Sequence, residues 1–289
     1  MITYVKRTTL NVTKYNTCIE NAIQSKIYAF SWYLDIVADN WDVLVWNDYE
    51  AVMPLPWKKK YGLKYIIQPY FCQQLGVFSI DEITLVIQDK FIKSIPKSFV
   101  KIDLNFNAHN LDQKNNRHKK LNYLLNLDKS YNELFKNFSK GRKHAVKSAY
   151  KNNLSTKAIT IAELIKITDE FYPDLNYSKD TLRALTNYVL KNNKGFIHGV
   201  FKDEHLLGGS LFLKSNERIV YLFSSYKKEA RKLQASSFSI ISVIEKYQNT
   251  KMVFDFEGGN IPSIGSFFKS FGASPEHFFC LSKKLFSKF

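Results

Sequence analysis

The chain has 289 residues, more than the roughly 100–150 of a typical domain, so we expect two domains of similar size. Hydrophobic residues make up 45% of the chain and charged residues 24%, which permits a sizeable core and excludes wholesale disorder. The formal net charge of +16 indicates an anionic partner such as RNA or phosphate groups, although a general excess of lysine explains it equally well.

The cysteines and the hydropathy of the sequence indicate the compartment in which the protein works and exclude some kinds of site. Cys18, Cys72 and Cys280 are far apart and odd in number, which argues against a disulfide framework and against a cysteine-based metal site. The N-terminus lacks the apolar stretch of a secretion signal, and no run approaches the ~18 apolar residues of a spanning helix. We therefore expect a cytoplasmic protein without an integral membrane segment.

The first half predicts a helix followed by a β-hairpin. Apolar residues at helical spacing predict the helix over about 17–32. Two β-rich runs, 41–46 and 51–56, flank the polar turn 47–50 and predict the hairpin.

An aromatic and basic segment, 57–65, follows this hairpin and joins two strands. Its composition is typical of an exposed loop, but aromatic rings beside lysines also suit the stacking and neutralisation of a nucleotide. We include Trp57 and Tyr65 among the predicted acceptor-binding residues.

A polar stretch over 110–120 carries no apolar rhythm and is either the domain boundary or an exposed loop. Taken as the boundary, it predicts an N-terminal domain over 1–120 and a C-terminal domain over 121–289.

A basic helix is predicted over 140–153. Lys143, Lys147 and Lys151 fall four residues apart and form one stripe, in which like charges repel. An anion bound along the stripe would offset this cost, and so would solvent and salt. We assign Arg142, because of its planar fork, and Lys143 to acceptor binding, on a face for RNA or a phosphorylated precursor.

The second half repeats this helix and hairpin. A helix is predicted over 181–190 with Ser178 able to cap its start, and hairpin strands over 195–201 and 206–213. The two hairpins align at a constant offset of 155 residues: Val45 with Val200, Trp46 with Phe201, Asp48 with Asp203 and Val52 with Leu207. The chain therefore looks internally duplicated.

The remaining elements complete a mixed α/β order. They are a strand over 218–225, a helix over 232–247, a strand over 252–256, a helix over 264–271 ended by Gly272, and a strand region over 277–285.

This element order is that of the GNAT core, and two motifs point to one of its branches. Residues 254–260 read Phe-Asp-Phe-Glu-Gly-Gly-Asn, and residues 267–273 read Phe-Phe-Lys-Ser-Phe-Gly-Ala. Both motifs, and the basic helix, resemble features of FemAB-like proteins. The resemblance implies an α/β (α+β) fold of two tandem GNAT-like domains, each a mixed central sheet flanked by helices. It also implies an N-acyltransferase or aminoacyltransferase acting on an amine of a cell-envelope precursor, as in peptidoglycan synthesis.

One departure from the GNAT pattern bears on the donor. Segment 226–236 corresponds to the loop that binds the coenzyme A pyrophosphate, yet it has no glycine, and without glycine the backbone cannot easily adopt φ > 0. This weighs against acetyl-CoA, while basic residues there can still meet an anionic donor: aminoacyl-tRNA, another acyl-CoA or acyl carrier protein. The predicted donor-binding residues are Ser224, Ser225, Lys228, Arg231, Gln234 and Ala235. Tyr226, on the splayed strand where a backbone N–H can stabilise an oxyanion, is assigned a catalytic role.

Polar residues also emerge where the strand over 252–256 meets the Gly-Gly turn. Asp255, Glu257 and Asn260 can position or deprotonate an acceptor amine, or Asp255 or Asn260 can cap the following helix. We assign Asp255 a catalytic role and Glu257, Asn260 and Lys269 to acceptor binding.

Other chemistries find little support, because phosphate-binding glycine loops and zinc-protease motifs are missing and the six histidines lack metal-ligand spacing. The predicted function is therefore acyl transfer to an amine, with the donor as substrate, no assigned cofactor and no metal. The alternative is a non-catalytic RNA-binding or scaffold protein with a degenerate GNAT fold.

Overall fold

The computed structural model describes residues 1–111, 119–215 and 217–284, and the chain divides into two compact units. Unit 1 comprises Met1–Lys120 with the segment from His277, and unit 2 comprises Leu121–Glu276. The predicted C-terminal domain, 121–289, differs from this division because the last strand pairs within unit 1. Of the predicted boundary segment, residues 112–118 lie outside the described residues.

Unit 1 is a mixed sheet with helices on both faces. Its elements are β1 (Ile2–Lys6), α1 (Val12–Asn21), α2 (Ser31–Val37), β2 (Asn40–Trp46), β3 (Ala51–Lys60), β4 (Leu63–Ile67), β5 (Phe78–Ser79), α3 (Leu85–Lys93), β6 (Phe99–Asn105) and β13 (Ser274–Lys284). The strand order is β1-β2-β3-β4-β6-β13, with β5 paired to β3. Neighbours are antiparallel except for the parallel pair β4 and β6.

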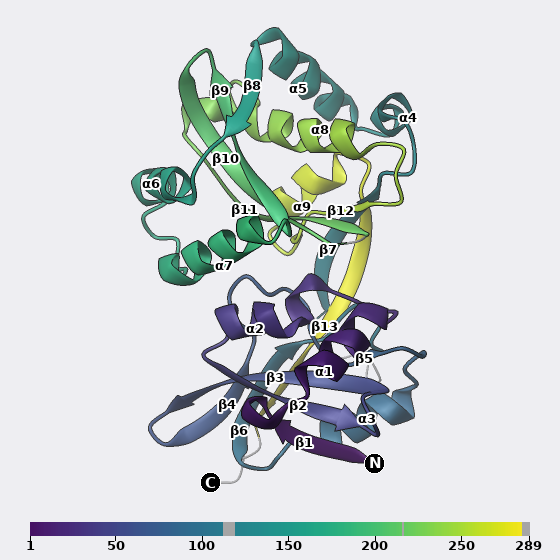
Figure 1. The fold of residues 1–289 in the computed structure, drawn as a ribbon. Helices are drawn as coiled ribbons and strands as arrows, with labels where there is room; N and C mark the ends of the chain where they lie inside the picture. Colours follow the sequence, from purple (N-terminus) through teal and green to yellow (C-terminus); the bar gives the residue numbers. More distant parts are fainter. Residues whose placement is uncertain (112–118, 216, 285–289) are drawn as a thin grey trace. The chain divides into compact units, whose positions relative to one another are not determined.

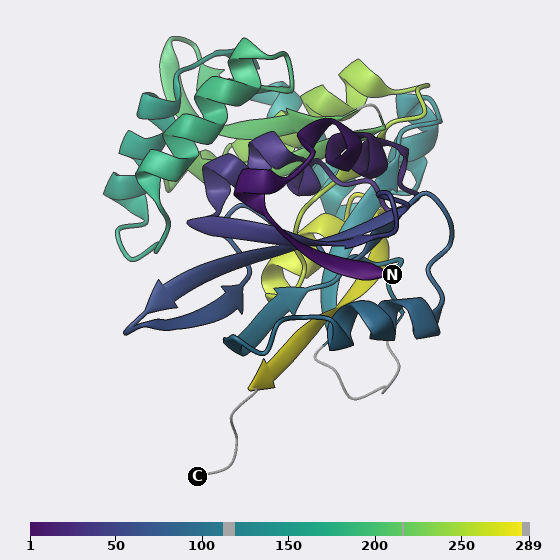
Figure 2. The same cartoon turned by 60° about the horizontal axis from the view of Figure 1, so that its bottom comes forward.

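Alternation along β2 places the helices of unit 1 on opposite faces of its sheet. Trp41 contacts Tyr15 of α1, with ring centroids 5.3 Å apart, whereas Trp46 contacts Phe91 of α3 at 6.1 Å. Because side chains an odd number of residues apart point to opposite faces of a strand, α1 and α3 must cover different faces. Figure 2 shows the two helices on either side of the strands.

The continuous helix predicted over 17–32 is wrong in its middle. Helix α1 ends at Asn21, a 3-10 turn occupies Ile27–Ala29, and α2 begins only at Ser31. Tertiary hydrogen bonds hold the start of α2 against α1. The Asn16 side chain accepts a hydrogen bond from the Ser31 N–H at 3.0 Å and donates one to the Ser31 hydroxyl at 2.9 Å.

Unit 2 repeats the plan. Its elements are β7 (Lys119–Asn126), α4 (Tyr131–Lys136), α5 (Lys140–Lys151), β8 (Leu154–Ala158), α6 (Ile161–Phe171), α7 (Lys179–Lys191), β9 (Gly195–Lys202), β10 (His205–Lys214), β11 (Arg218–Tyr226), α8 (Ala235–Tyr247), β12 (Val253–Asp255) and α9 (Pro262–Lys269). The strand order is β7-β12-β11-β10-β9-β8, antiparallel except for β11 and β12. Figure 1 shows α8 over one face of these strands and α6 and α7 over the other.

Both predicted hairpins are confirmed, as β2 with β3 and β9 with β10. The predicted cap of α7 is also confirmed, because the Ser178 side chain accepts a hydrogen bond from the Thr181 N–H at 3.2 Å. Within the described chain, no helix is both long and apolar enough to cross a membrane.

Candidate functional site

In unit 2 the two parallel strands β11 and β12 separate at their carboxyl ends. Their ladder has three pairs and ends where Val220 faces Asp255. Strand β12 stops there, whereas β11 continues to Tyr226. The edge of β11 beyond Val220 therefore lies outside this ladder and faces the space between the strands, where ligands bind in many α/β proteins.

A pocket of about 380 Å³ occupies this opening. One wall is formed by 221–224 of β11, and the other by 256–261 after β12, with Ile264 and Phe268 of α9 beside them. Of the predicted site residues, Ser224, Glu257 and Asn260 come together here.

The Gly-Gly motif shapes one side of this pocket. Gly259 has a φ of 156°, and a Cβ added there would lie 3.0 Å from the Tyr123 ring. A Cβ on Gly265 would lie 2.7 Å from the Gly259 carbonyl oxygen. A side chain at Gly265 would clash with the turn, because α9 packs directly against it, and one at Gly259 would crowd the side chains of β7.

Asp255 lies beneath the pocket rather than in it. Its side chain is 1% exposed and pairs with the Arg218 guanidinium at 2.6 Å. It also accepts hydrogen bonds from the Asn122 amide at 2.8 Å and the Glu257 N–H at 3.0 Å. These contacts position the turn that carries Glu257, and they do not support the predicted role of Asp255 as a base that touches an acceptor.

The capping alternative predicted for Asp255 or Asn260 is wrong. Helix α9 begins at Pro262, with Ile261 in the cap position and no side-chain cap. The Asn260 side chain instead accepts a hydrogen bond from the Leu121 N–H at 2.9 Å, so it ties the turn to the start of β7.

Tyr226 points into the core under α8. Its hydroxyl bonds Ser210 at 2.7 Å, Ser210 bonds Ser239 at 3.0 Å, and Ser239 bonds His198 Nε2 at 2.8 Å. Burial raises the pKa of Tyr226 well above its ordinary value. Because the Tyr226 hydroxyl is buried and takes part in this series of hydrogen bonds, its position does not support the predicted catalytic role of the side chain.

Tyr221, which the sequence did not single out, lines the pocket instead. Burial raises its pKa, and hydrogen bonds with Ser224, Ser210 and Tyr226 partly oppose that rise. The β10–β11 register shifts at this point, pairing Tyr221 with Phe212 and Phe223 with Leu211. This bulge lets Tyr221 and Ser224 share a face although they are three residues apart, and no feature of the sequence signals it.

The predicted donor-binding segment connects β11 to α8. Lys228 and Arg231 are exposed, whereas the side chains of Ala235 and Ser225 are buried. Among the described residues the Ser225 hydroxyl has no hydrogen-bond partner, and Ser225 does not line the pocket.

Helix α8 begins at Ala235, three residues after the predicted start. Gln234 precedes it with a φ of 62°, so the expectation that a glycine-free segment avoids φ > 0 is wrong at this residue. Gln234 supplies no side-chain cap, and the first intrahelical bond runs from the Phe238 N–H to its carbonyl oxygen at 3.0 Å. The three amides before Phe238 belong to the positive helix end, which attracts anions.

Arg142 is buried rather than exposed. Its guanidinium lies beside the rings of both Phe267 and Phe271, 4.3 and 4.4 Å from their centroids, and donates to the hydroxyls of Ser237 and Ser270. Burial lowers its pKa to about 10. It therefore ties α5 to α8 and α9, a placement that does not support the predicted acceptor contact.

The outer side of α5 is basic and open. Lys140, Lys143, His144 and Lys147 line a depression of about 720 Å³, and the Lys143 ammonium donates to the Lys136 carbonyl oxygen at 2.7 Å. Lys269 is exposed at the end of α9.

In unit 1 the predicted loop over 57–65 is wrong, because β3 and β4 extend through it and only Tyr61 and Gly62 form a turn. Tyr65 lines a mainly apolar pocket of about 320 Å³ with Leu63 and Val100. Trp57 lines a different, polar pocket of about 430 Å³.

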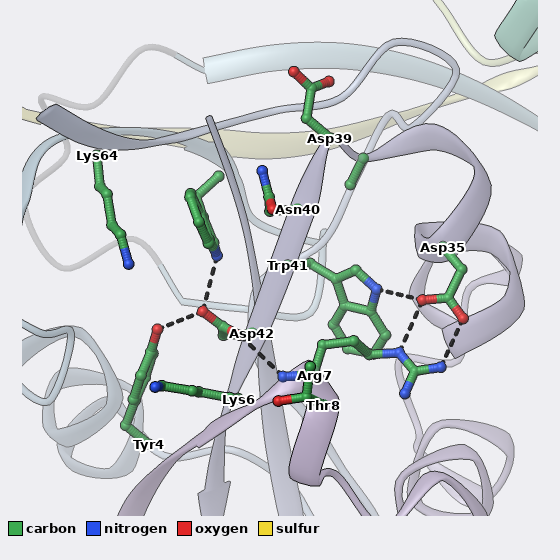
Figure 3. A pocket seen from close by; sticks show the side chains of 12 residues that line it. Tyr4, Lys6, Arg7, Thr8, Asp35, Asp39, Asn40, Trp41, Asp42 and Lys64 are labelled. Carbon is green, nitrogen blue, oxygen red and sulfur yellow. Dashed lines mark hydrogen bonds and ion pairs between the residues drawn. The ribbon is translucent and has the colours of Figure 1, made fainter. Parts of the chain in front are cut away.

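Figure 3 shows that two carboxylates of this polar pocket, those of Asp35 and Asp42, are already engaged. Asp42 accepts hydrogen bonds from the Tyr4 hydroxyl, the Trp57 indole N–H at 2.8 Å and the Arg7 N–H at 2.9 Å. Asp35 pairs bidentately with the Arg7 guanidinium, both contacts being 2.8 Å. These contacts make the cluster a structural network that holds β1 against β2 and β3.

In unit 1 the corresponding strand ends are bridged by the unit's own chain, so the described residues leave no such opening there. Its parallel pair, β4 and β6, is continued by the Gln68 N–H, which donates to the Asp103 carbonyl oxygen at 2.9 Å. The Gln68 side chain accepts from the Asn105 N–H at 3.0 Å, and the Leu75 N–H donates to the Asn105 carbonyl oxygen at 2.8 Å. Residues 68–75 therefore lie along the end of β6 and bond to it.

No protein-family model matches the sequence, and no curated protein matches it. Among solved structures, FemX superposes with a TM-score of 0.67 at 12% identity, covering 93% of this chain and 95% of its own. A tandem GNAT protein from the clavulanic acid biosynthesis pathway superposes with a TM-score of 0.55 at 11% identity, covering 100% of both chains. The chain thus has the FemX-like tandem GNAT fold, and the predicted fold class is confirmed.

Proposed function

We propose that the protein is an N-acyltransferase that moves an acyl or aminoacyl group from an activated donor to an amine, with the reaction in unit 2. The observation that carries this proposal is the opening between β11 and β12 with its pocket of about 380 Å³. A non-catalytic RNA-binding or scaffold protein would have no need of this opening, so we do not favour that alternative.

The donor carbonyl would lie against the edge of β11 that faces the opening. A backbone N–H on that edge, within 221–224, can donate to the oxygen that becomes negative as the amine attacks. The anionic part of the donor would meet the N-terminus of α8, with Lys228 and Arg231 beside it.

The acceptor amine would enter beside Glu257. Attack by the neutral amine forms the new C–N bond and breaks the donor's C–O or C–S bond, while a base takes the amine proton. Glu257 is the carboxylate that lines the pocket, and Asp255 holds its backbone N–H, so we assign Glu257 as that base and Asp255 as its positioning residue.

The donor class and acceptor form the finer part of the proposal. The basic outer side of α5 suits an extended anionic donor, either aminoacyl-tRNA or acyl carrier protein, better than a small acyl-CoA. A phosphorylated cell-envelope precursor carrying an amine is the proposed acceptor.

The test is a donor and acceptor screen read by mass spectrometry. Purified protein is offered acyl-CoAs, acyl carrier proteins or charged tRNAs together with amine acceptors, and the expected product is an amide. Glu257→Gln should lower turnover by about 10²–10⁴-fold, as removal of a general base does. The matched control is Glu204→Gln in the β9–β10 turn, where the side chain is 91% exposed. Saturable RNA binding without turnover of any donor would contradict the proposal.

A further inference from the structure

The hairpin of β3 and β4 ends in a tip formed by 58–64, called here the β3–β4 tip. Lys60 pairs with Leu63, and Tyr61 and Gly62 form the two-residue turn with φ of 51° and 78°. Two positive φ values are those of a type I′ turn, which suits a tightly twisted hairpin. Figure 2 shows this hairpin projecting from the body of its unit.

The tip exposes bulky apolar side chains. Tyr61 is 91% exposed and Leu63 is 55% exposed. On β4, Tyr65 and Ile67 follow Leu63 at alternate positions, and with Val100 they line the mainly apolar pocket of about 320 Å³. Contiguous exposed apolar surface of this kind marks an interaction site more often than scattered single residues do.

Lysines surround this apolar surface. Lys58, Lys59, Lys60 and Lys64 lie on the tip, and Lys101 lies beside it on β6. Two carboxylates approach them: Asp39 is 3.0 Å from the Lys58 ammonium, and Asp103 is 3.7 Å from that of Lys101. The described part of this surface therefore carries more positive than negative charge.

We propose that the β3–β4 tip docks on an anionic phospholipid surface, with Tyr61 and Leu63 entering the interface between headgroups and acyl chains. Tyrosine prefers this interface, leucine gains by leaving water, and lysines extend their ammonium groups to lipid phosphates. The attraction of each lysine to such a surface is a known contribution to peripheral binding. The inference is independent of the acyl-transfer proposal.

A nucleic acid fits the same tip less well. Base stacking needs successive exposed aromatic platforms, whereas at the tip Tyr61 is exposed, Tyr65 is half-buried and Leu63 has no ring. The cations are lysines rather than the arginines that grip phosphates bidentately. A projecting turn also lacks the groove that tracks a single strand.

Cosedimentation with vesicles tests the proposal. The protein should partition onto vesicles of mixed phosphatidylcholine and phosphatidylglycerol and remain free with phosphatidylcholine alone. Tyr61→Ser combined with Leu63→Ser should lower the partition coefficient by roughly tenfold. Lys59→Gln and Lys60→Gln should each lower it by roughly fivefold at low salt.

Matched controls lie elsewhere on the surface. Val86→Ser removes an exposed apolar side chain on α3, and Lys166→Gln removes an exposed charge on α6, so both should bind as the parent does. The proposal fails if the parent protein does not bind anionic vesicles, or if the Tyr61→Ser, Leu63→Ser double variant binds them as well as the parent does. Saturable binding of single-stranded RNA that requires Tyr61, without vesicle binding, would assign the tip to nucleic acid and also overturn it.

A site-specific probe separates insertion from simple adsorption. The three native cysteines are buried, so Tyr61→Cys can be labelled selectively with an environment-sensitive fluorophore. Its emission should shift to the blue on anionic vesicles, whereas the same label at Val86→Cys should not respond. A response at position 86 without one at position 61 would contradict docking through the tip.

Discussion

The two units share one fold but treat the ends of their parallel strands differently. In unit 2, β11 and β12 part after three pairs and leave a pocket. In unit 1, β4 and β6 are followed by residues 68–75, which bond along the end of β6. The two units therefore share the scaffold without sharing the opening.

The two units differ at these strand ends because, in unit 1, side chains form the hydrogen bonds that a longer pair of strands would form. Gln68 and Asn105 supply the amide donors and acceptors that a longer strand pair would supply, so the backbone at the opening in unit 1 is satisfied without a ligand. In unit 2 the chain leaves β11 for α8 through residues 227–234, which include a 3-10 turn over Glu229–Arg231. Under the proposed function, the open strand end, in addition to the fold, is what lets unit 2 hold an acyl donor.

The largest expected effect compares the two buried carboxylates. Asp255→Asn should cost about 3–5 kcal/mol of unfolding free energy, because it removes the charge that pairs with Arg218. Asp42→Asn should cost only about 1–3 kcal/mol, since its partners are neutral donors. Urea denaturation of both variants measures the difference, and equal losses would show that the ion pair adds nothing to unit 2.

The next prediction concerns acid. Burial, with a smaller contribution from Lys246, lowers the pKa of His198 to about 4. Because the unfolded chain protonates this residue near its ordinary pKa of about 6.5, stability should fall by up to roughly 3 kcal/mol as pH drops from 6.5 to 4.

At the offset of 155 residues, His198 corresponds to Val43, which is buried in β2. The acid sensitivity from this position should therefore be confined to unit 2. Hydrogen exchange across the pH range, with His198→Gln as the reference, would resolve it. An equal pH response in wild type and variant would remove His198 as the cause.

A third prediction compares neighbours on α5. Arg142→Met keeps the contact with the two phenylalanine rings but removes the hydrogen bonds to Ser237 and Ser270, so it should cost about 2 kcal/mol. Lys143→Met, on the outer side, should change stability by less than about 0.5 kcal/mol. Thermal melting of both variants checks this prediction. A larger loss of stability in Lys143→Met than in Arg142→Met would contradict the assignment of Arg142 to the buried face of α5.

The smallest effect tests the connection before α8. Gln234→Gly should be neutral or stabilise the protein by up to about 1 kcal/mol, because glycine adopts its φ of 62° without steric cost. Differential scanning calorimetry can detect this shift. A destabilised variant would mean that the 3.3 Å contact between the Gln234 side chain and Ser237 outweighs the backbone cost.

The sequence predicted what depends on local pattern. The β9–β10 hairpin and the Ser178 cap could be predicted because the alternation of apolar residues and the presence of a capping residue are local signals. The motif over 254–260 also predicted one side of the pocket. The single helix over 17–32 failed because the Asn16 amide, a tertiary partner, decides where α2 begins.

Site residues were harder to predict for a physical reason. The pattern of a basic helix predicts an exposed arginine, and only the three-dimensional packing shows Arg142 buried against two phenylalanine rings. Tyr221 depends on a β-bulge, and the closed opening of unit 1 depends on the partners of Gln68. Neither is encoded in residue spacing.

The most direct measurement places one tryptophan at each strand end. Leu222→Trp enlarges a residue that lines the pocket of unit 2, and Tyr70→Trp makes a similar change at a half-exposed position in the closing segment of unit 1. With a donor and acceptor pair from the screen, Leu222→Trp should lose at least about a hundredfold in turnover at an unchanged melting temperature, and Tyr70→Trp should stay within about twofold. Full turnover by Leu222→Trp, with loss in Tyr70→Trp, would contradict a reaction centred on the opening of unit 2.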